Sequence, residues 1–174
     1  MADVLSLVRL LGATTHTLHL DDPPEAGDAG GRSRWISALG DSLTLLQDRG
    51  TPLSSISVET LMYPFRWIDP LLERFPLTVC LDLGHLILRG RPLWDTFLKY
   101  ERNTSIIHLH GADIHTDHQP LDFLSEDHLK TVLRILNRFG GTVSLEVFRF
   151  DALAESLALL DRLLPVRKKD RGQR

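Results

Sequence analysis

The stretch Leu77-Thr78-Val79-Cys80-Leu81-Asp82, with His85 shortly after it, decides the fold of this chain. It is a short apolar run, rich in β-branched residues, that stops on a side chain with high affinity for metals. Continuous apolar runs of this length are typical of strands that are buried on both faces. Three more segments follow the same pattern: Ile56–Glu59, Ser105–His108 and Thr142–Glu146. A fifth run, Thr14–Leu20, carries His19 near its end.

Helical patterns alternate with these runs. Strands are expected at residues 14–20, 56–59, 78–82, 106–109 and 143–147. Helices are expected at residues 4–11, 35–50, 68–75, 93–100, 125–138 and 151–164, the last one capped by Asp151. A Pro/Gly/Asp-rich loop is expected at residues 21–31. Such alternation predicts an α/β fold with a parallel sheet and right-handed crossovers.

The number of units points to an incomplete barrel. Five strand–helix units are visible, whereas a (β/α)8 TIM barrel has eight and about 250 residues. We therefore predict a TIM barrel truncated to about its last five β/α units over residues 1–164, followed by a basic, flexible tail at residues 165–174. An open doubly wound sheet is the alternative, and the lack of a Gly-rich loop after the first strand disfavours it.

Composition narrows the function classes. The chain has 174 residues and a formal net charge of −3, which disfavours general nucleic-acid binding. Cys80 is its one cysteine, so a disulfide framework is excluded, and a cytoplasmic location is expected. No apolar stretch approaches the ~20 residues that a membrane span needs.

Strand ends are where the chemistry is expected. In barrels of parallel strands the carboxyl ends meet at one mouth, which holds the active site. Glu59, Asp82, His108 and Glu146 would meet there, and their carboxylates and imidazole suit Zn²⁺ or Mn²⁺. One such residue alone is more often a cap or an ion-pair partner, but the repetition over four strands favours a metal site.

Several neighbouring residues are further candidates. Gly84 would permit a tight turn that returns His85 to the mouth. By strand alternation His110 shares a face with His108, and it either binds a ligand or hydrogen-bonds the loop backbone. The remaining candidates near the mouth are Tyr63, Asp117, His118 and His19. Asp113 and His115 are interpreted as solvated loop residues, and His16 should face away from His19.

The segments SVETL, CLDLGH, IHLHG, DHQPL and SLEVF, in this order, resemble the xylose-isomerase-like TIM-barrel superfamily. That superfamily includes endonuclease IV, sugar epimerases and myo-inosose dehydratases. The resemblance implies a divalent-metal site made of Glu59, Asp82, His108 and Glu146. Endonuclease IV-like members hold two or three ions, and for such a cluster the resemblance implies further ligands: His19, His85, Asp117 and His118.

The residues of these segments more closely resemble those of the cobamide-remodelling phosphodiesterases. These enzymes hydrolyse the phosphodiester in the nucleotide loop of a corrinoid. This implies a metal-dependent hydrolase in which Glu59, Glu146 and His85 are catalytic. It also implies substrate contacts from His110, Asp117 and Tyr63. Two departures stand out: about three N-terminal units are absent, and the Asp-x-His pair of endonuclease IV appears here as adjacent Asp117 and His118.

Three alternatives remain open. A sugar isomerase or epimerase would use one ion, with Glu59 and Glu146 as acid and base. An endonuclease IV-like enzyme would cleave DNA, which the net charge disfavours. A barrel fragment that lacks its completing units would be inactive. The expected partner is a small molecule, either a corrinoid or a sugar.

Overall fold

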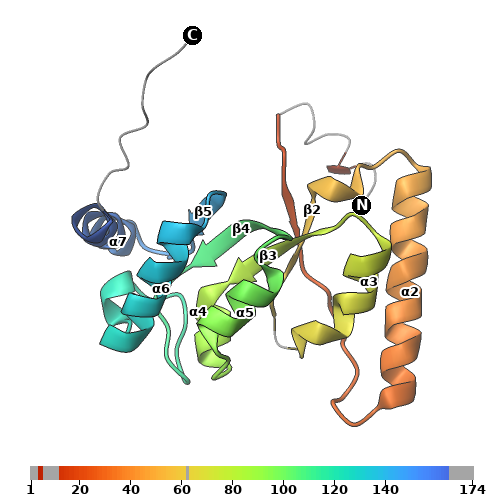
Figure 1. The fold of residues 1–174 in the computed structure, drawn as a ribbon, viewed down its shortest axis with the longest axis horizontal. Coiled ribbons are helices and arrows are strands. Elements are labelled where there is room, and N and C mark those ends of the chain that lie inside the picture. Colours follow the sequence, from red (N-terminus) through yellow and green to blue (C-terminus); the bar gives the residue numbers. More distant parts are fainter. Residues whose placement is uncertain (1–3, 6–11, 62, 165–174) are drawn as a thin grey trace.

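The computed structural model describes residues 4–5, 12–61 and 63–164, and these form a five-stranded parallel sheet. The strands are β1 (His16–Leu18), β2 (Ile56–Glu59), β3 (Thr78–Asp82), β4 (Thr104–Leu109) and β5 (Thr142–Leu145). Their order in space equals their order in the chain (Figure 1). The predicted partial barrel is thus confirmed, because a doubly wound sheet would reverse its strand order about a central strand.

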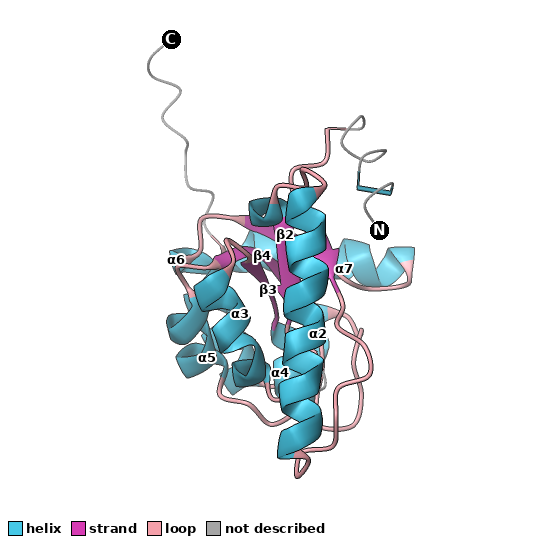
Figure 2. Ribbon diagram, turned by 90° about the vertical axis from the view of Figure 1, so that its right-hand side faces the viewer, coloured by secondary structure: helices cyan, strands magenta, loops and turns pink. Residues whose placement is uncertain are grey.

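The helices follow the strands as crossovers. They are α2 (Ala29–Asp48), α3 (Asp69–Arg74), α4 (Leu83–Leu88), α5 (Leu93–Tyr100), α6 (Glu126–Arg138) and α7 (Phe150–Leu163), with short 3₁₀ turns η1 (Leu53–Ser55), η2 (Phe65–Ile68) and η3 (Leu121–Phe123). Helices α3, α5 and α6 lie on the same side of the strands (Figure 2). Among the described residues, no helix has both the length and the apolarity that crossing a membrane requires.

The two faces of the sheet differ in chemistry. Ile56 and Val58 of β2, like Val79 and Leu81 of β3, are buried in the apolar core that the helices cover. Because side chains alternate along a strand, the residues between them point to the other, concave face. That face carries the polar members of the same strands: Ser57, Glu59, Thr78, Cys80 and Asp82. The strands are buried as expected, but only one of their faces is aliphatic.

Three local expectations are corrected. Helix α2 begins at Ala29, inside the expected loop, because Asp28 Oδ1 accepts a hydrogen bond from Gly31 N at 2.7 Å and caps it. Gly84 does not make a tight turn but lies in α4. Asp151 is not the cap of α7; Arg149 holds that position and pairs with the Asp151 carboxylate.

Two expectations fall largely outside the part of the chain that is described. The helix predicted at residues 4–11 is helical at residues 4 and 5, and residues 6–11 are not described. The tail predicted at residues 165–174 also lies outside the described residues.

Candidate metal centre

The ends of four neighbouring strands bring four polar side chains together. Glu59 ends β2 and Asp82 ends β3, and Asp82 is in register with His108 of β4. Glu146 follows β5 directly, and its backbone N–H donates to Leu109 O at 3.0 Å, which extends the pairing by one step. The parallel sheet thus places all four residues together at the carboxyl ends of its strands, as the sequence predicted.

His108 lies at the middle of this group. Its Nδ1 is 3.0 Å from Glu146 Oε1 and 3.3 Å from Glu59 Oε2. One ligand atom each from Asp82, His108 and Glu146 lies within 4.8 Å of the others. The same holds for Glu59, Asp82 and His85. The two groups share Asp82, and each is compact enough to hold one cation.

A second group consists of three imidazoles, those of His85, His110 and His118. His85 Nδ1 lies 3.3 Å from Asp82 Oδ2 and 3.4 Å from Glu59 Oε1. His110 is fully buried, with Nε2 3.2 Å from Asp82 Oδ1. Its ring stacks on that of His118 at 4.2 Å, and its Nδ1 accepts a hydrogen bond from the His118 backbone N–H at 2.9 Å. His85 and His110 therefore contact Asp82 directly, whereas His118 lies 4.0 Å from Glu146.

The other candidates lie around this centre. His19 Nε2 is 2.9 Å from Glu59 Oε2, whereas His16 lies at the other end of β1 and lines a small cavity with Gly50. Asp117 Oδ1 is 3.1 Å from His118 Nδ1. The buried Tyr63 donates its hydroxyl to Glu59 O at 3.3 Å.

The loop that carries Asp117 is held by a residue outside the centre. Asp113 Oδ1 accepts hydrogen bonds from the backbone N–H groups of His115 and Thr116, each at 2.7 Å. These bonds and the backbone pairing of Gly111 with Gln119 fix the path of the loop between β4 and η3. Asp113 thus has a structural contact, and it is not part of the metal-ligand groups found among the described residues.

Buried polar atoms in this cluster fit a cation. Asp82 Oδ2, His85 Nδ1, His108 Nδ1 and His110 Nε2 are buried without a hydrogen-bond partner of acceptable geometry. Buried polar atoms in native proteins are nearly always satisfied, and those that are not call for an explanation. Carboxylate oxygens and imidazole nitrogens are the ligands that Zn²⁺ and Mn²⁺ accept. The donor set therefore fits the divalent metal that the sequence predicted.

The charges in the cluster are strongly coupled. Burial would raise the pKa of Glu59, but contacts with His108 and His85 outweigh burial and hold it well below its usual range. Burial would lower the pKa of His108, yet Cys80, Glu146 and Glu59 raise it far above its usual range. His85 shows the same balance, with burial outweighed by Glu59 and Asp82. Glu59 is thus an anion at neutral pH, which a cation can bind without displacing a proton from it.

The sequence analysis missed Cys80 as a member of the centre, and it assigned Gly84 the wrong role. Cys80 forms a compact group with Glu59 and His108, and burial raises the pKa of its thiol. Its position two residues before Asp82 on the same strand face was the available signal. Gly84 leaves room for the His110 ring, because a Cβ there would lie 2.0 Å from His110 Cε1. That contact joins α4 to β4 and could not be read from spacing.

Comparisons with known proteins support the fold. No protein-family model matches the sequence, and no curated protein matches it. Among solved structures, the chain is similar to a xylose isomerase domain protein from Planctomyces limnophilus, with 22% identity, a TM-score of 0.65 and coverage of 93% of this chain. A D-allulose 3-epimerase from Methylomonas sp., solved with D-allulose, gives 15% identity, a TM-score of 0.61 and 90% coverage. A 3-keto-D-glucoside 4-epimerase from E. coli gives 17% identity, a TM-score of 0.61 and 93% coverage.

The likeness covers part of each neighbour. The chain matches 62%, 59% and 68% of the length of these three structures, in the same order. It therefore has the fold of about three fifths of a xylose-isomerase-like TIM barrel. Nothing in these comparisons points to the cobamide phosphodiesterases in particular.

Proposed function

We propose that this protein is a metal-dependent isomerase or epimerase that acts on a sugar. The observation that carries the proposal is the convergence of Glu59, Asp82, His108 and Glu146 at one sheet edge, with buried donor atoms that lack hydrogen bonds. Two of the three similar structures are named as sugar epimerases, and the proposal takes its sugar class from them. Because those structures share less than 25% identity with the chain, they support the fold, and the site itself carries the chemistry.

The two glutamates differ in exposure, and this difference suggests different roles. A bound divalent ion would polarise a carbonyl or hydroxyl oxygen of the substrate. The side chain of Glu59 is 2% exposed and is fixed by His19 and His108, so it serves as a ligand. The side chain of Glu146 is 29% exposed and lines an open cavity of about 510 Å³. Glu146 is therefore the carboxylate that can remove a proton from, or return it to, a substrate carbon.

His85 is placed to orient the substrate. It lines the cavity above the centre, contacts both Glu59 and Asp82, and is 14% exposed. An imidazole N–H at this position can donate a hydrogen bond to a sugar oxygen. His110 is fully buried against Asp82 and so acts through the orientation of that carboxylate rather than through the substrate.

A phosphodiesterase is the second candidate, because of the imidazole group of His85, His110 and His118. A second ion there would lie beside the first, and paired ions are typical of enzymes that hydrolyse phosphodiesters. In this candidate the substrate is the nucleotide loop of a cobamide, as the sequence resemblance implies. His118 would then be a ligand, with Asp117 holding its other ring nitrogen.

Metal content and product analysis together test the two candidates. The purified chain is loaded with Zn²⁺ or Mn²⁺, and ions per chain are counted by elemental analysis. It is then incubated with ketose and aldose sugars, with a cobamide and with abasic DNA. We expect one ion per chain and interconversion of sugars. Glu146→Gln should abolish the interconversion, whereas His16→Ala should change neither the metal content nor the activity. Two or three ions with cobamide hydrolysis and no sugar turnover would overturn the isomerase proposal.

A further inference from the structure

A cavity of about 440 Å³ adjoins the metal centre on one side. Its walls are the loop after β2, the turn after α4, and helix α5, which all lie beyond the carboxyl ends of β2 and β3. His85 lines both this cavity and the open one above the metal centre. The two cavities therefore meet at this side chain, and a ligand that fills one lies next to the other. The volume is in the range of small-molecule sites, roughly 300–1,000 Å³.

The cavity is basic although the chain carries a net charge of −3. Asp95 is the only carboxylate among the lining residues. Four cationic side chains line the cavity: Arg66, Arg89, Arg91 and Lys99. Lys99 is neutralised by Asp69, with Nζ 2.6 Å from Oδ2. Among the described residues, no carboxylate forms an ion pair with Arg66 or Arg91. At least these two of the three guanidinium groups in the lining can therefore bind an anion.

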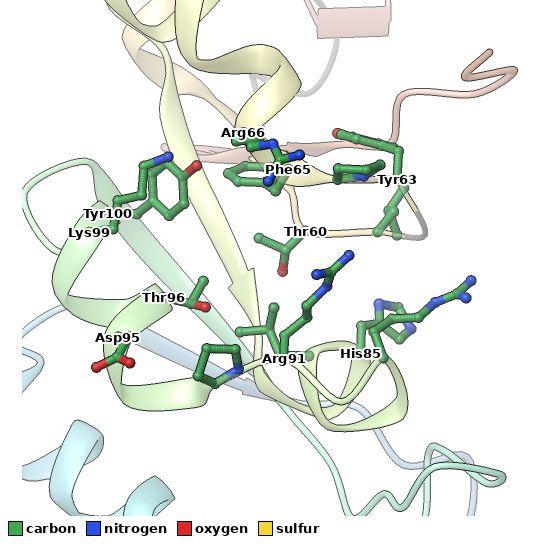
Figure 3. Close-up of a pocket in the computed structure, with 15 residues that line it drawn as sticks. Thr60, Tyr63, Phe65, Arg66, His85, Arg91, Asp95, Thr96, Lys99 and Tyr100 are labelled. Carbon is green, nitrogen blue, oxygen red and sulfur yellow. The ribbon is translucent and has the colours of Figure 1, made fainter. Parts of the chain in front are cut away.

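Figure 3 shows how these two groups are held. Arg66 comes from η2, and Arg91 from the turn after α4, so they reach the cavity from different walls. Thr60 lies between them, and its Oγ1 accepts a hydrogen bond from the backbone N–H of Asp82 at 2.8 Å. The cavity is therefore tied directly to the backbone of a residue in the metal centre.

The chemistry of the walls selects the ligand. A guanidinium binds planar or tetrahedral oxyanions through two parallel N–H groups, and this geometry suits phosphate and carboxylate. Phe65, Leu86 and Pro92 add apolar surface that would contact a carbon skeleton, and Thr60, Thr96 and Tyr100 add polar side chains. A neutral sugar would leave both guanidinium groups without an anionic partner.

We propose that this cavity binds the anionic group, a phosphate or a carboxylate, of a substrate whose reacting carbons lie at the metal centre. The substrate of the proposed isomerase is then an acidic sugar, such as a sugar phosphate or a uronate, rather than a neutral one. The identity of the substrate as an acidic sugar rests on the proposed function. Anion binding by the cavity does not depend on it.

Binding is tested without catalysis. Inorganic phosphate and acetate are titrated into the metal-free protein by calorimetry at two salt concentrations. We expect phosphate or acetate to bind, with affinity that falls as salt rises, and Arg66→Gln or Arg91→Gln to weaken binding about tenfold or more. Arg162→Gln is the matched control, because it removes one positive charge from exposed α7, away from the cavity. Thermal unfolding checks that each variant is folded.

Three compounds with one carbon skeleton then identify the group. D-glucose, D-glucose 6-phosphate and D-glucuronate differ only at the sixth carbon, so their relative affinities show whether phosphate or carboxylate is bound. Equal affinity for all three, or anion binding that both arginine variants retain, would overturn the proposal. Anion binding that depends on Arg66 and Arg91 in a protein that isomerises no sugar would leave the cavity standing and refute the proposed function.

Discussion

At the scale of single residues, Asp82 has two separable roles, as a candidate metal ligand and as the cap of α4. Its carboxylate belongs to both overlapping ligand groups, and its Oδ1 also accepts a hydrogen bond from His85 N at 2.7 Å, which caps α4. Asp82→Asn retains an oxygen for the cap but loses the charge, whereas Asp82→Ala loses both. We expect both variants to weaken metal binding by at least about a hundredfold. In the metal-free protein we expect only Asp82→Ala to lower the free energy of unfolding, by about 1 kcal/mol.

Metal titration and chemical denaturation of the metal-free proteins measure these two effects. If Asp82→Asn bound metal as tightly as the original protein, Asp82 would not be a ligand. If Asp82→Asn lost as much stability as Asp82→Ala, the cap oxygen that it retains would not be what stabilises the protein.

His108 sets the pH dependence of metal binding. Burial lowers its pKa, but its contacts with Cys80, Glu146 and Glu59 outweigh burial and raise it, so the metal-free protein keeps a proton on His108 at neutral pH. A cation must displace that proton, so its apparent affinity should rise with pH, about tenfold per unit while the pH lies below this pKa.

Calorimetry in two buffers of different ionisation enthalpy counts the protons released for each ion. We expect about one proton from His108, since Glu59 is already ionised. An apparent affinity that does not change between about pH 6 and pH 8 would contradict this account.

At the scale of elements, the contact between α4 and β4 holds the centre together. Gly84 of α4 faces the His110 ring, and a Cβ there would lie 2.0 Å from His110 Cε1. We expect Gly84→Ala to destabilise the protein by about 1–3 kcal/mol, because the buried ring must shift. The shift would also move His110 Nε2 away from Asp82, so metal affinity should fall with stability.

Gly140→Ala is the control for this variant, since a Cβ at Gly140 meets no atom within 4 Å. Its free energy of unfolding should stay within about 0.5 kcal/mol of the original. Denaturation of both variants gives the comparison, and equal stabilities would show that α4 can move away from β4 freely.

The bounds of the strands and helices show which features of the fold could be predicted from the sequence. Strands β2 and β3 and helix α5 have the predicted bounds, because apolar runs and helical spacing report burial directly. The gathering of Glu59, Asp82, His108 and Glu146 also followed from strand ends alone. Gly84 was interpreted as a turn because the residue that its α-carbon contacts, His110, is 26 residues away in the chain. Cys80 was overlooked because the same apolar run hid the alternation of its two faces.

At the scale of the whole molecule, the sheet is open. Strands β1 and β5 each pair with one neighbour in the described part of the chain, so each leaves a row of backbone N–H and C=O groups unpaired. Exposed apolar side chains occur at β5 and directly after it in the chain, with Val143 of β5 38% exposed and Phe150 at the start of α7 86% exposed. Unpaired strand edges beside exposed apolar side chains are sites where chains associate.

We therefore expect this chain to self-associate as its concentration rises, through the β5 edge. Thr142→Lys places a charge on the exposed start of β5, and Phe150→Ser removes the most exposed aromatic ring beside it, so both should shift the equilibrium toward monomer. Leu98→Ser on α5 removes an apolar side chain that is 42% exposed but lies away from this edge, and it should leave association unchanged. Sedimentation velocity over a range of concentrations measures the effect. A single monomeric species throughout that range would show that the open edge is protected in a way that strand pairing and apolar exposure do not explain.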